Sequence, residues 1–249
     1  MFAAHRTRPV RLARLAAAHH RSRETDRLLG ILLAAIAGSL NAGGFILLSQ
    51  YTSHMTGHLS MIAGGMVVQN VVVILQSLAV VGFFTLGAAL SAGLIAWGQV
   101  NRLRICYALP LGVQGVLLAS IALVEEMPPH IADYVGLCLV AFVMGLQNAT
   151  ITRISGARIR TSHATGLITD LGIEIGRGIY RIFAPRSGIR HDTAKLWLFI
   201  QLVLAFVVGG VAGAVGHGLI GWDFAVPPGV ALVLLALWRR APRIEPSAA

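Results

Sequence analysis

Charged residues are scarce in this chain of 249 residues, and acidic residues are scarcer than basic ones. Charged side chains make up 12% of the sequence and hydrophobic residues 56%, whereas an ordinary soluble domain has roughly 25% charged and about 45–50% apolar residues. A water-soluble fold of this size needs more polar surface than this sequence supplies, because soluble proteins keep charges on their outside. The composition therefore excludes an ordinary soluble domain.

Cysteine and the common catalytic motifs are also missing or nearly so. The two cysteines, Cys106 and Cys138, both lie in apolar runs, which excludes a disulfide framework and a Cys-x-x-Cys metal site. We interpret them as small packing residues. The sequence has no P-loop, Rossmann glycine fingerprint, His-Glu-x-x-His site or Gly-x-Ser-x-Gly elbow. We therefore expect no cofactor and no metal, and no ATP-driven transport by this chain alone.

What the sequence does contain is a series of apolar runs, most of them near the roughly 20 residues that cross about 30 Å of hydrocarbon. The prolines Pro227 and Pro228 fall near the start of the last run, where a helix tolerates proline best. The prediction is an all-α integral membrane protein with six transmembrane helices, over residues 28–48, 67–98, 105–124, 131–151, 196–217 and 224–238.

The positive charge of the chain is arranged by segment. The net charge is +10, but residues that bind phosphate backbones cluster on one face among aromatics, and here they lie between apolar runs, so no nucleic-acid partner is expected. Lysine and arginine mark the cytoplasmic side of a membrane protein. Segments 1–27, 99–104, 152–195 and 239–249 hold seven, two, eight and three of them, which accounts for all twenty. We therefore expect both termini to be cytoplasmic.

The first 27 residues form a basic leader with seven arginines. A signal peptide is also basic and then apolar, but this leader is long for one. The following apolar run also ends in a motif that recurs at 145–149, where no signal peptidase acts. We interpret 1–27 and 239–249 as cytoplasmic tails, with an amphipathic helix over 10–18 held near anionic lipid headgroups.

A polar motif occurs twice in the sequence, as TSHMTGHLS at 52–60 and TSHATGLIT at 161–169. GSLNA at 38–42 precedes the first copy and GLQNA at 145–149 precedes the second. Two further predicted spans follow each copy, so the chain divides into three-helix repeats at 28–124 and 131–238. Because three is odd, the second repeat enters the membrane from the opposite side. Such inverted repeats are typical of secondary transporters, which bind solute at the repeat interface.

The motif residues predict a short broken or re-entrant helix in each repeat. Ser and Thr accept bonds from helix N-terminal N–H groups, and glycine permits close approach, so we expect helices to begin at Ser53 or Thr56 and at Ser162 or Thr165. Exposed N–H groups at such ends favour anions. Hydroxyls in membrane helices also simply bond their own backbone or bridge neighbours, and this alternative stays open. The candidate substrate-binding residues are Asn41, Ser53, His54, Thr56, Gly57, Asn148, Ser162, His163, Thr165 and Gly166.

Two carboxylates lie in the second motif segment. Asp170 and Glu174 stand one helical turn apart, with Arg177 three residues beyond Glu174. An ionisable group at membrane depth is a candidate for ion coupling, whereas an ion-pair face at the cytoplasmic surface is the alternative. The first copy has no carboxylate, and its His58 corresponds to Leu167 in the second.

Taken together, GSLNAGGF, SHMTGH, GLQNA and TSHATG resemble the YoaK family of bacterial multi-pass membrane proteins, over about residues 26–240. In the pattern of that family an aspartate is common where this chain has Asn41, and an asparagine where it has His58. The family was long catalogued as a domain of unknown function. The resemblance implies a location in the bacterial cytoplasmic (inner) membrane and a transporter-like role, and it implies no substrate.

Three functions follow from these observations. The leading one is a small secondary transporter or permease for a small polar or anionic solute, because 28 glycines permit close packing and rearrangement of helices. A second is a non-transporting scaffold or sensor whose basic tail binds partners or lipid. An intramembrane hydrolase using Ser53–His54 or Ser162–His163 is the third, but adjacent residues rarely point at each other, so we expect no enzyme. Membrane lipid is the expected environment, and six helices are compatible with a homo-oligomer.

Overall fold

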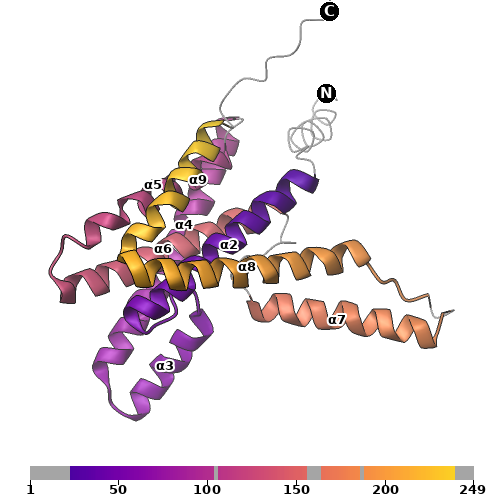
Figure 1. The fold of residues 1–249 in the computed structure, drawn as a ribbon, viewed down its shortest axis with the longest axis horizontal. Coiled ribbons are helices and arrows are strands. Elements are labelled where there is room, and N and C mark those ends of the chain that lie inside the picture. Colours follow the sequence, from indigo (N-terminus) through magenta and orange to yellow (C-terminus); the bar gives the residue numbers. More distant parts are fainter. Residues whose placement is uncertain (1–22, 104–105, 156–163, 186–187, 239–249) are drawn as a thin grey trace, which may run out of the picture.

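The structure is a computed structural model that describes residues 23–103, 106–155, 164–185 and 188–238 (Figure 1). Every regular element in these ranges is a helix, which confirms the all-α prediction. The elements are α2 (Arg23–Leu48), α3 (Met55–Val67), α4 (Val71–Val100), α5 (Ala108–Ala119), η1 (Ser120–Val124), α6 (Pro129–Ile154), α7 (Ala164–Phe183), α8 (Thr193–Ile220), η2 (Gly221–Ala225) and α9 (Val226–Trp238). The amphipathic helix over 10–18, the second tail and the motif residues Ser162 and His163 lie outside the described residues.

Four helical stretches are long and apolar enough to cross a membrane, judged by length and composition: Asp26–Leu48, Val71–Val100, Ile131–Ile154 and Thr193–Leu237. The last contains both the fifth and the sixth predicted spans, which are separated at Gly221, where φ is 59°, a value that glycine adopts without strain. The third predicted span is divided into α5 and the 3₁₀ turn η1. The chain is thus a membrane protein by its helices, and the number of six spans stays a prediction.

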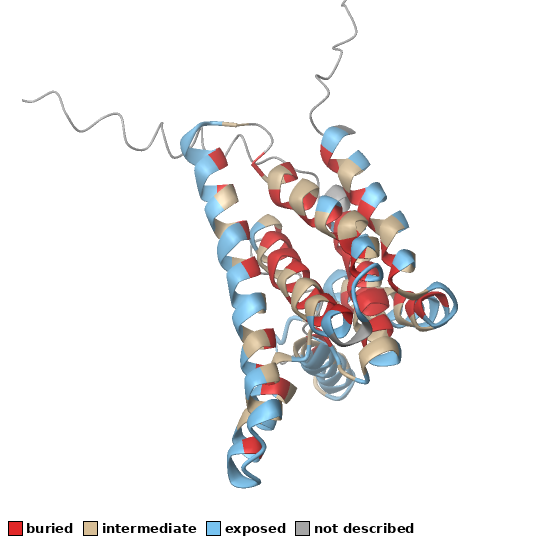
Figure 2. Cartoon of the chain, turned by 90° about the vertical axis from the view of Figure 1, so that its left-hand side faces the viewer, coloured by how far each residue is buried: buried red, intermediate tan, exposed pale blue. Residues whose placement is uncertain are grey.

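The long helices differ in how much of their apolar surface is covered. In the most apolar part of α2 and of α6, 50% and 61% of the residues are buried, against 17% for α4 and 22% for the stretch that includes α8. Figure 2 shows exposed residues running the length of the outer helices around a buried centre. Exposed apolar surface on this scale is unfavourable in water. We therefore interpret α4 and α8 as lipid-facing and α2 and α6 as central.

The helices α2 and α8 lie side by side in the same direction. A Cβ atom on Gly38 would stand 1.9 Å from the carbonyl oxygen of Phe206, and one on Gly209 would stand 2.0 Å from that of Ala35. No side chain fits at either position, so the two glycines permit the backbones to touch.

The helices α4 and α6 repeat this arrangement. A Cβ atom on Gly145 would stand 1.9 Å from the carbonyl oxygen of Phe84, and one on Gly87 would stand 1.9 Å from that of Phe142. Gly38 and Gly145 begin the two Gly-x-x-Asn-Ala motifs, and the helix facing each of them carries the same Phe-x-x-Gly pattern. One crossing geometry is therefore used twice, by two pairs of helices far apart in the sequence.

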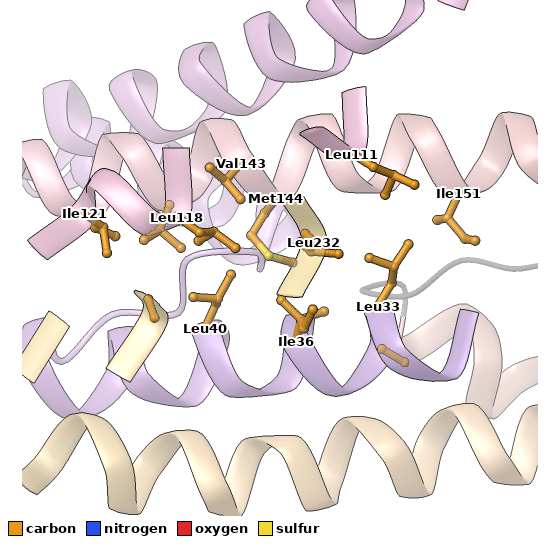
Figure 3. Close-up of a cluster of buried hydrophobic side chains, with 14 of the residues drawn as sticks. Leu33, Ile36, Leu40, Leu111, Leu118, Ile121, Val143, Met144, Ile151 and Leu232 are labelled. Atoms are coloured by element: carbon orange, nitrogen blue, oxygen red, sulfur yellow. The ribbon is translucent and has the colours of Figure 1, made fainter. Parts of the chain in front are cut away.

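The remaining pair, α5 and α9, is antiparallel. A Cβ atom on Gly115 would stand 2.7 Å from the carbonyl oxygen of Gly229, and one on Gly112 would stand 3.5 Å from the Cβ of Ala236. Between this pair and the central helices lies the apolar core (Figure 3), with Leu33, Leu40, Leu111, Leu118, Met144, Ile151 and Leu232 among its buried members.

Candidate functional site

The first motif copy folds back onto the end of α2. The Oδ1 atom of Asn41 accepts hydrogen bonds from the backbone N–H of Ser53 at 3.1 Å and from its hydroxyl at 2.9 Å. Thr52 is fully buried, and its hydroxyl donates to the carbonyl of Leu40 at 3.5 Å. The structure therefore brings two candidate residues, Asn41 and Ser53, into direct contact.

The helix α3 begins at Met55, with His54 at the N-cap position and no side-chain cap. The predicted capping by Ser53 or Thr56 is wrong, because the Ser53 hydroxyl donates to Asn41 instead of accepting from the helix. His54 and Thr56 are both exposed. A Cβ atom on Gly57 would stand 2.1 Å from the ring of His54, so glycine is needed for the ring to lie over the first turn.

His58 is the buried polar residue of α3. Its Nε2 lies 3.0 Å from the carbonyl oxygen of Tyr51. A carbonyl can only accept, so Nε2 carries the proton and Nδ1 presents a lone pair. Burial lowers the pKa of the His58 imidazole, the bond to Tyr51 raises this pKa, and nearby His54 lowers it further.

The second motif copy is described from Ala164 onward, where α7 begins. Thr165 is exposed and Gly166 half-buried in its first turn, and Asn148 is half-buried on α6. Leu167 is buried at the position that corresponds to His58. The two motif helices therefore bury the same register position.

The turns after the two motif helices also match. Asn70 caps α4 by accepting from the N–H of Val73, and Asp192 caps α8 by accepting from the N–H of Lys195. Asx residues at N-caps satisfy the first free N–H groups of a helix. Each motif helix is thus the first arm of a helical hairpin whose second arm starts with the same type of cap.

Glu174 ties α7 to the start of α8. Its carboxylate accepts from Arg177 Nη1 at 3.0 Å and from the N–H of Asp192 at 3.3 Å. His191 Nδ1 and Lys195 Nζ lie 3.7 and 3.9 Å away. The pair with Arg177 is confirmed, but the Glu174 side chain is only 3% exposed. The Glu174 carboxylate is thus buried within an ion-pair cluster in which Arg177 and Lys195 are 50% and 47% exposed, and Asp170, one turn earlier, is half-buried. Both the ion-coupling prediction and the surface ion-pair alternative stay predictions.

These features all lie within the part of the chain that one family model matches. A family model described as "Protein of unknown function (DUF1275)" matches residues 29–238, which include both motif copies and all the helices from α3 to α9. The chain belongs to the DUF1275 family. This agrees with the resemblance of its motifs to an uncharacterised membrane family. No curated protein and no solved structure matches the chain.

No hydrogen bond joins the two motif copies of this DUF1275 chain among the described residues. Figure 1 shows α3 and α7 extending in different directions from the central helices. Among the same residues there is no group of three or more His, Cys, Asp or Glu side chains that could hold a metal ion. The convergence of both motifs on one solute site therefore stays a prediction.

Sequence reasoning missed a buried polar chain between α2, α5 and α6. The Nε2 of Gln147 donates to the carbonyl of Leu33 at 2.7 Å, and the Nε2 of Gln114 donates to Gln147 Oε1 at 2.5 Å. Both glutamine side chains are fully buried. The available signal was a glutamine inside each of two apolar runs, one of them within the GLQNA motif of the DUF1275 chain.

Proposed function

We propose that this chain is a small secondary transporter or permease for a small polar or anionic solute. It would consist of two inverted three-helix repeats in the bacterial cytoplasmic membrane, with both termini in the cytoplasm. The observation that carries the proposal is the duplicated helix crossing, in which Gly38 meets Phe206 and Gly145 meets Phe84. Duplication of a whole packing unit within a membrane protein is typical of transporter folds.

Helix directions support the inverted arrangement. With six spans, the first and fifth (α2 and α8) cross in the same direction, as do the second and fourth (α4 and α6). The third and sixth (α5 and α9) cross in opposite directions. The glycine contacts of α2 with α8 advance together, Ala35 with Gly209 and Ser39 with Gly213, whereas those of α5 and α9 run in reverse. Under this proposal, a two-fold axis across the helices would exchange α2 with α6 and α5 with α9.

Close glycine contacts also supply the mobility that alternating access needs. Backbones that touch without interlocking side chains can slide or rock against each other at low cost. We place the solute site between the halves, with Asn41, Ser53, His54, Thr56 and Gly57 toward one face. The described second-copy residues Asn148, Thr165 and Gly166 would lie toward the other face.

Ion coupling, if the transporter uses it, would involve the second motif hairpin. Glu174 is a buried carboxylate that faces His191, Arg177 and Lys195, and a buried ionisable group in a membrane protein is a candidate for ion coupling. The first hairpin has Gly65 at the corresponding buried position. The two halves would then differ in chemistry while sharing their geometry.

The test is solute flux through the purified full-length protein in proteoliposomes, screened against a broad panel of small metabolites. We expect at least one solute to accumulate faster than in vesicles that lack protein. Engineered cysteines at 52–58 and 164–167 should then change their reactivity in opposite senses when this solute is present. Absence of flux for every solute, together with unchanged reactivity at both stretches, would leave the scaffold or sensor function in place of transport.

A further inference from the structure

The buried glutamine chain has a fixed orientation. The Leu33 carbonyl can only accept a hydrogen bond, so Gln147 must turn its NH₂ group toward it. The Oε1 of Gln147 then requires a donor, and Gln114 supplies its own NH₂ group. Flipping either amide would place two donors or two acceptors against each other. This leaves Gln114 Oε1 as the last atom of this series of hydrogen bonds, buried and without a hydrogen-bond partner among the described residues.

An amide oxygen without a partner is costly in this location. Gln114 is fully buried, and one turn away on either side of it α5 contributes Leu111 and Leu118 to the apolar core (Figure 3). Met144 and Ile151 flank Gln147 on α6 in the same way. Burial of a polar atom without a hydrogen bond is strongly unfavourable in apolar surroundings, and such exceptions among buried groups call for an explanation.

The two hydrogen-bonded glutamines lie where the two proposed repeats meet. Leu33 and Gln114 belong to the first repeat and Gln147 to the second, so each hydrogen bond of the glutamine pair joins one half to the other. The residue after Gln114 is Gly115, at the closest approach of α5 to α9. The helix that carries the unpartnered oxygen thus meets α9 through a glycine contact one residue away in the sequence.

We propose that Gln114 Oε1 is a solute-binding atom at the interface of the repeats, and that it binds a solute carrying an N–H or O–H donor, such as an amine, an amide or an alcohol. This inference rests on the proposed transport function and narrows its substrate class. An anion without an O–H or N–H group, such as formate or nitrate, offers no donor to an amide oxygen and would be repelled by its partial negative charge. Gln147 presents no alternative for an anion, because both ends of its side-chain amide are already engaged within the chain.

The test uses the full-length protein in detergent, with thermal unfolding as the readout. Methylammonium, acetamide and glycerol serve as donor probes, and formate and nitrate as anion probes. We expect a donor probe to raise the unfolding temperature, and Gln114→Leu to weaken this binding about three- to tenfold, the range expected for loss of one buried hydrogen bond. The matched control is Gln50→Leu, because Gln50 Oε1 is also buried without a partner but follows α2 outside the repeat interface. This control should leave donor binding unchanged.

Gln114→Glu protects the test against a Leu variant that does not fold. It keeps an acceptor at the same place and adds negative charge, so methylammonium should bind more tightly relative to acetamide. The inference is overturned if no donor probe binds, if Gln114→Leu and Gln50→Leu weaken binding equally, or if Gln114→Glu leaves the preference unchanged.

Flux in proteoliposomes separates this inference from the proposed function. If formate or nitrate is transported and this flux survives Gln114→Leu, the transport function is supported and the donor-binding site at Gln114 is ruled out. Binding of a donor probe through Gln114 without flux of any solute would retain the site and remove the transporter.

Discussion

At the scale of single residues, Asn41 acts as a hydrogen-bond acceptor. Its Oδ1 receives two bonds from Ser53, and a carboxylate oxygen would accept the same two bonds. This explains in physical terms how Asn41 can stand where the resembled family often has aspartate. The position holds the motif loop against α2, and its side-chain charge is not needed for that role.

We predict that Asn41→Ala destabilises the protein by about 0.5–1.5 kcal/mol, the net contribution of a typical hydrogen bond, because the two donors on Ser53 are only partly buried, whereas Asn41→Asp is tolerated. Thermal unfolding in detergent measures both. Ser53→Ala should be partly redundant with Asn41→Ala in a double-mutant cycle, because the two residues share a bond. Fully additive losses would show that the contact between them contributes nothing.

His58 predicts a dependence of stability on pH. Its pKa is lowered in the folded protein, mainly by burial, whereas an unfolded histidine titrates near about 6.5. The unfolded state therefore binds more protons below this value, and stability falls as the pH drops through and below it. We expect the unfolding temperature to fall between pH of about 7.5 and about 5.5, and His58→Gln to reduce this dependence. The exposed His54 serves as a control, and a His54→Gln variant that flattens the profile as much would contradict this assignment.

At the scale of helices, apolar runs predicted the positions of the helices well, and they did not predict where the type of helix changes within a run. Run length and proline placement located α2, α4, α6, α8, α9 and the α5–η1 segment to within about five residues. The helix α7, with 20 residues, was expected only as a short motif helix. The break at Gly221 falls within the predicted loop between residues 217 and 224. The change from α5 to η1 at Ser120 was missed, because it depends on local backbone geometry that apolar composition does not encode. The Phe-x-x-Gly pattern of α4 and α8 also went unnoticed, since its meaning is visible only when the facing helix is known.

The glycine crossings carry a direct prediction. A methyl group on Gly38 or Gly87 would overlap the backbone of the facing helix, with Cβ-to-oxygen distances of 1.9 Å at each. We expect Gly38→Ala and Gly87→Ala to destabilise the protein by about 1–3 kcal/mol or more. Gly82→Ala, on α4 with nothing within 4 Å of its Cβ, should be neutral or stabilise by about 0.5–1 kcal/mol. Thermal unfolding of the three variants side by side decides this, and similar losses in all three would contradict the crossing.

The helix α7 has two faces of different chemistry. Ile168, Ile175, Ile179 and Ile182 are 52%, 45%, 50% and 75% exposed on one side, and Arg177 and Arg181 lie on the other side of the wheel. A helix of this kind lies in a membrane surface with its apolar side among the acyl chains.

We therefore predict that α7 is interfacial and does not re-enter the membrane core. Spin labels at Ile175 and Ile179 in the reconstituted protein should be accessible to oxygen and shielded from a water-soluble nickel reagent. A label at Arg181 should show the reverse. Equal accessibility on both sides would remove the interfacial placement.

At the scale of the whole molecule, the duplication of the motifs predicted two related halves but placed their meeting point at the motifs. The structure shows the motif helices directed outward, while the halves touch through Gly38, Gly145 and the buried Gln114–Gln147 bond. A repeat in sequence reports which segments correspond, and it does not report which faces pack together. That information lies in long-range contacts between helices that one sequence does not reveal.

The central claim is that two corresponding halves cross the membrane in opposite orientations. Thr56 and Thr165 occupy the same motif position and are both exposed. In a protein with Cys106 and Cys138 replaced by alanine, single cysteines at these positions are labelled with a membrane-impermeant thiol reagent, in intact cells and in inverted membrane vesicles. The inverted repeat predicts labelling of Thr56→Cys in cells and of Thr165→Cys in inverted vesicles. Labelling of both positions from the same side would contradict it.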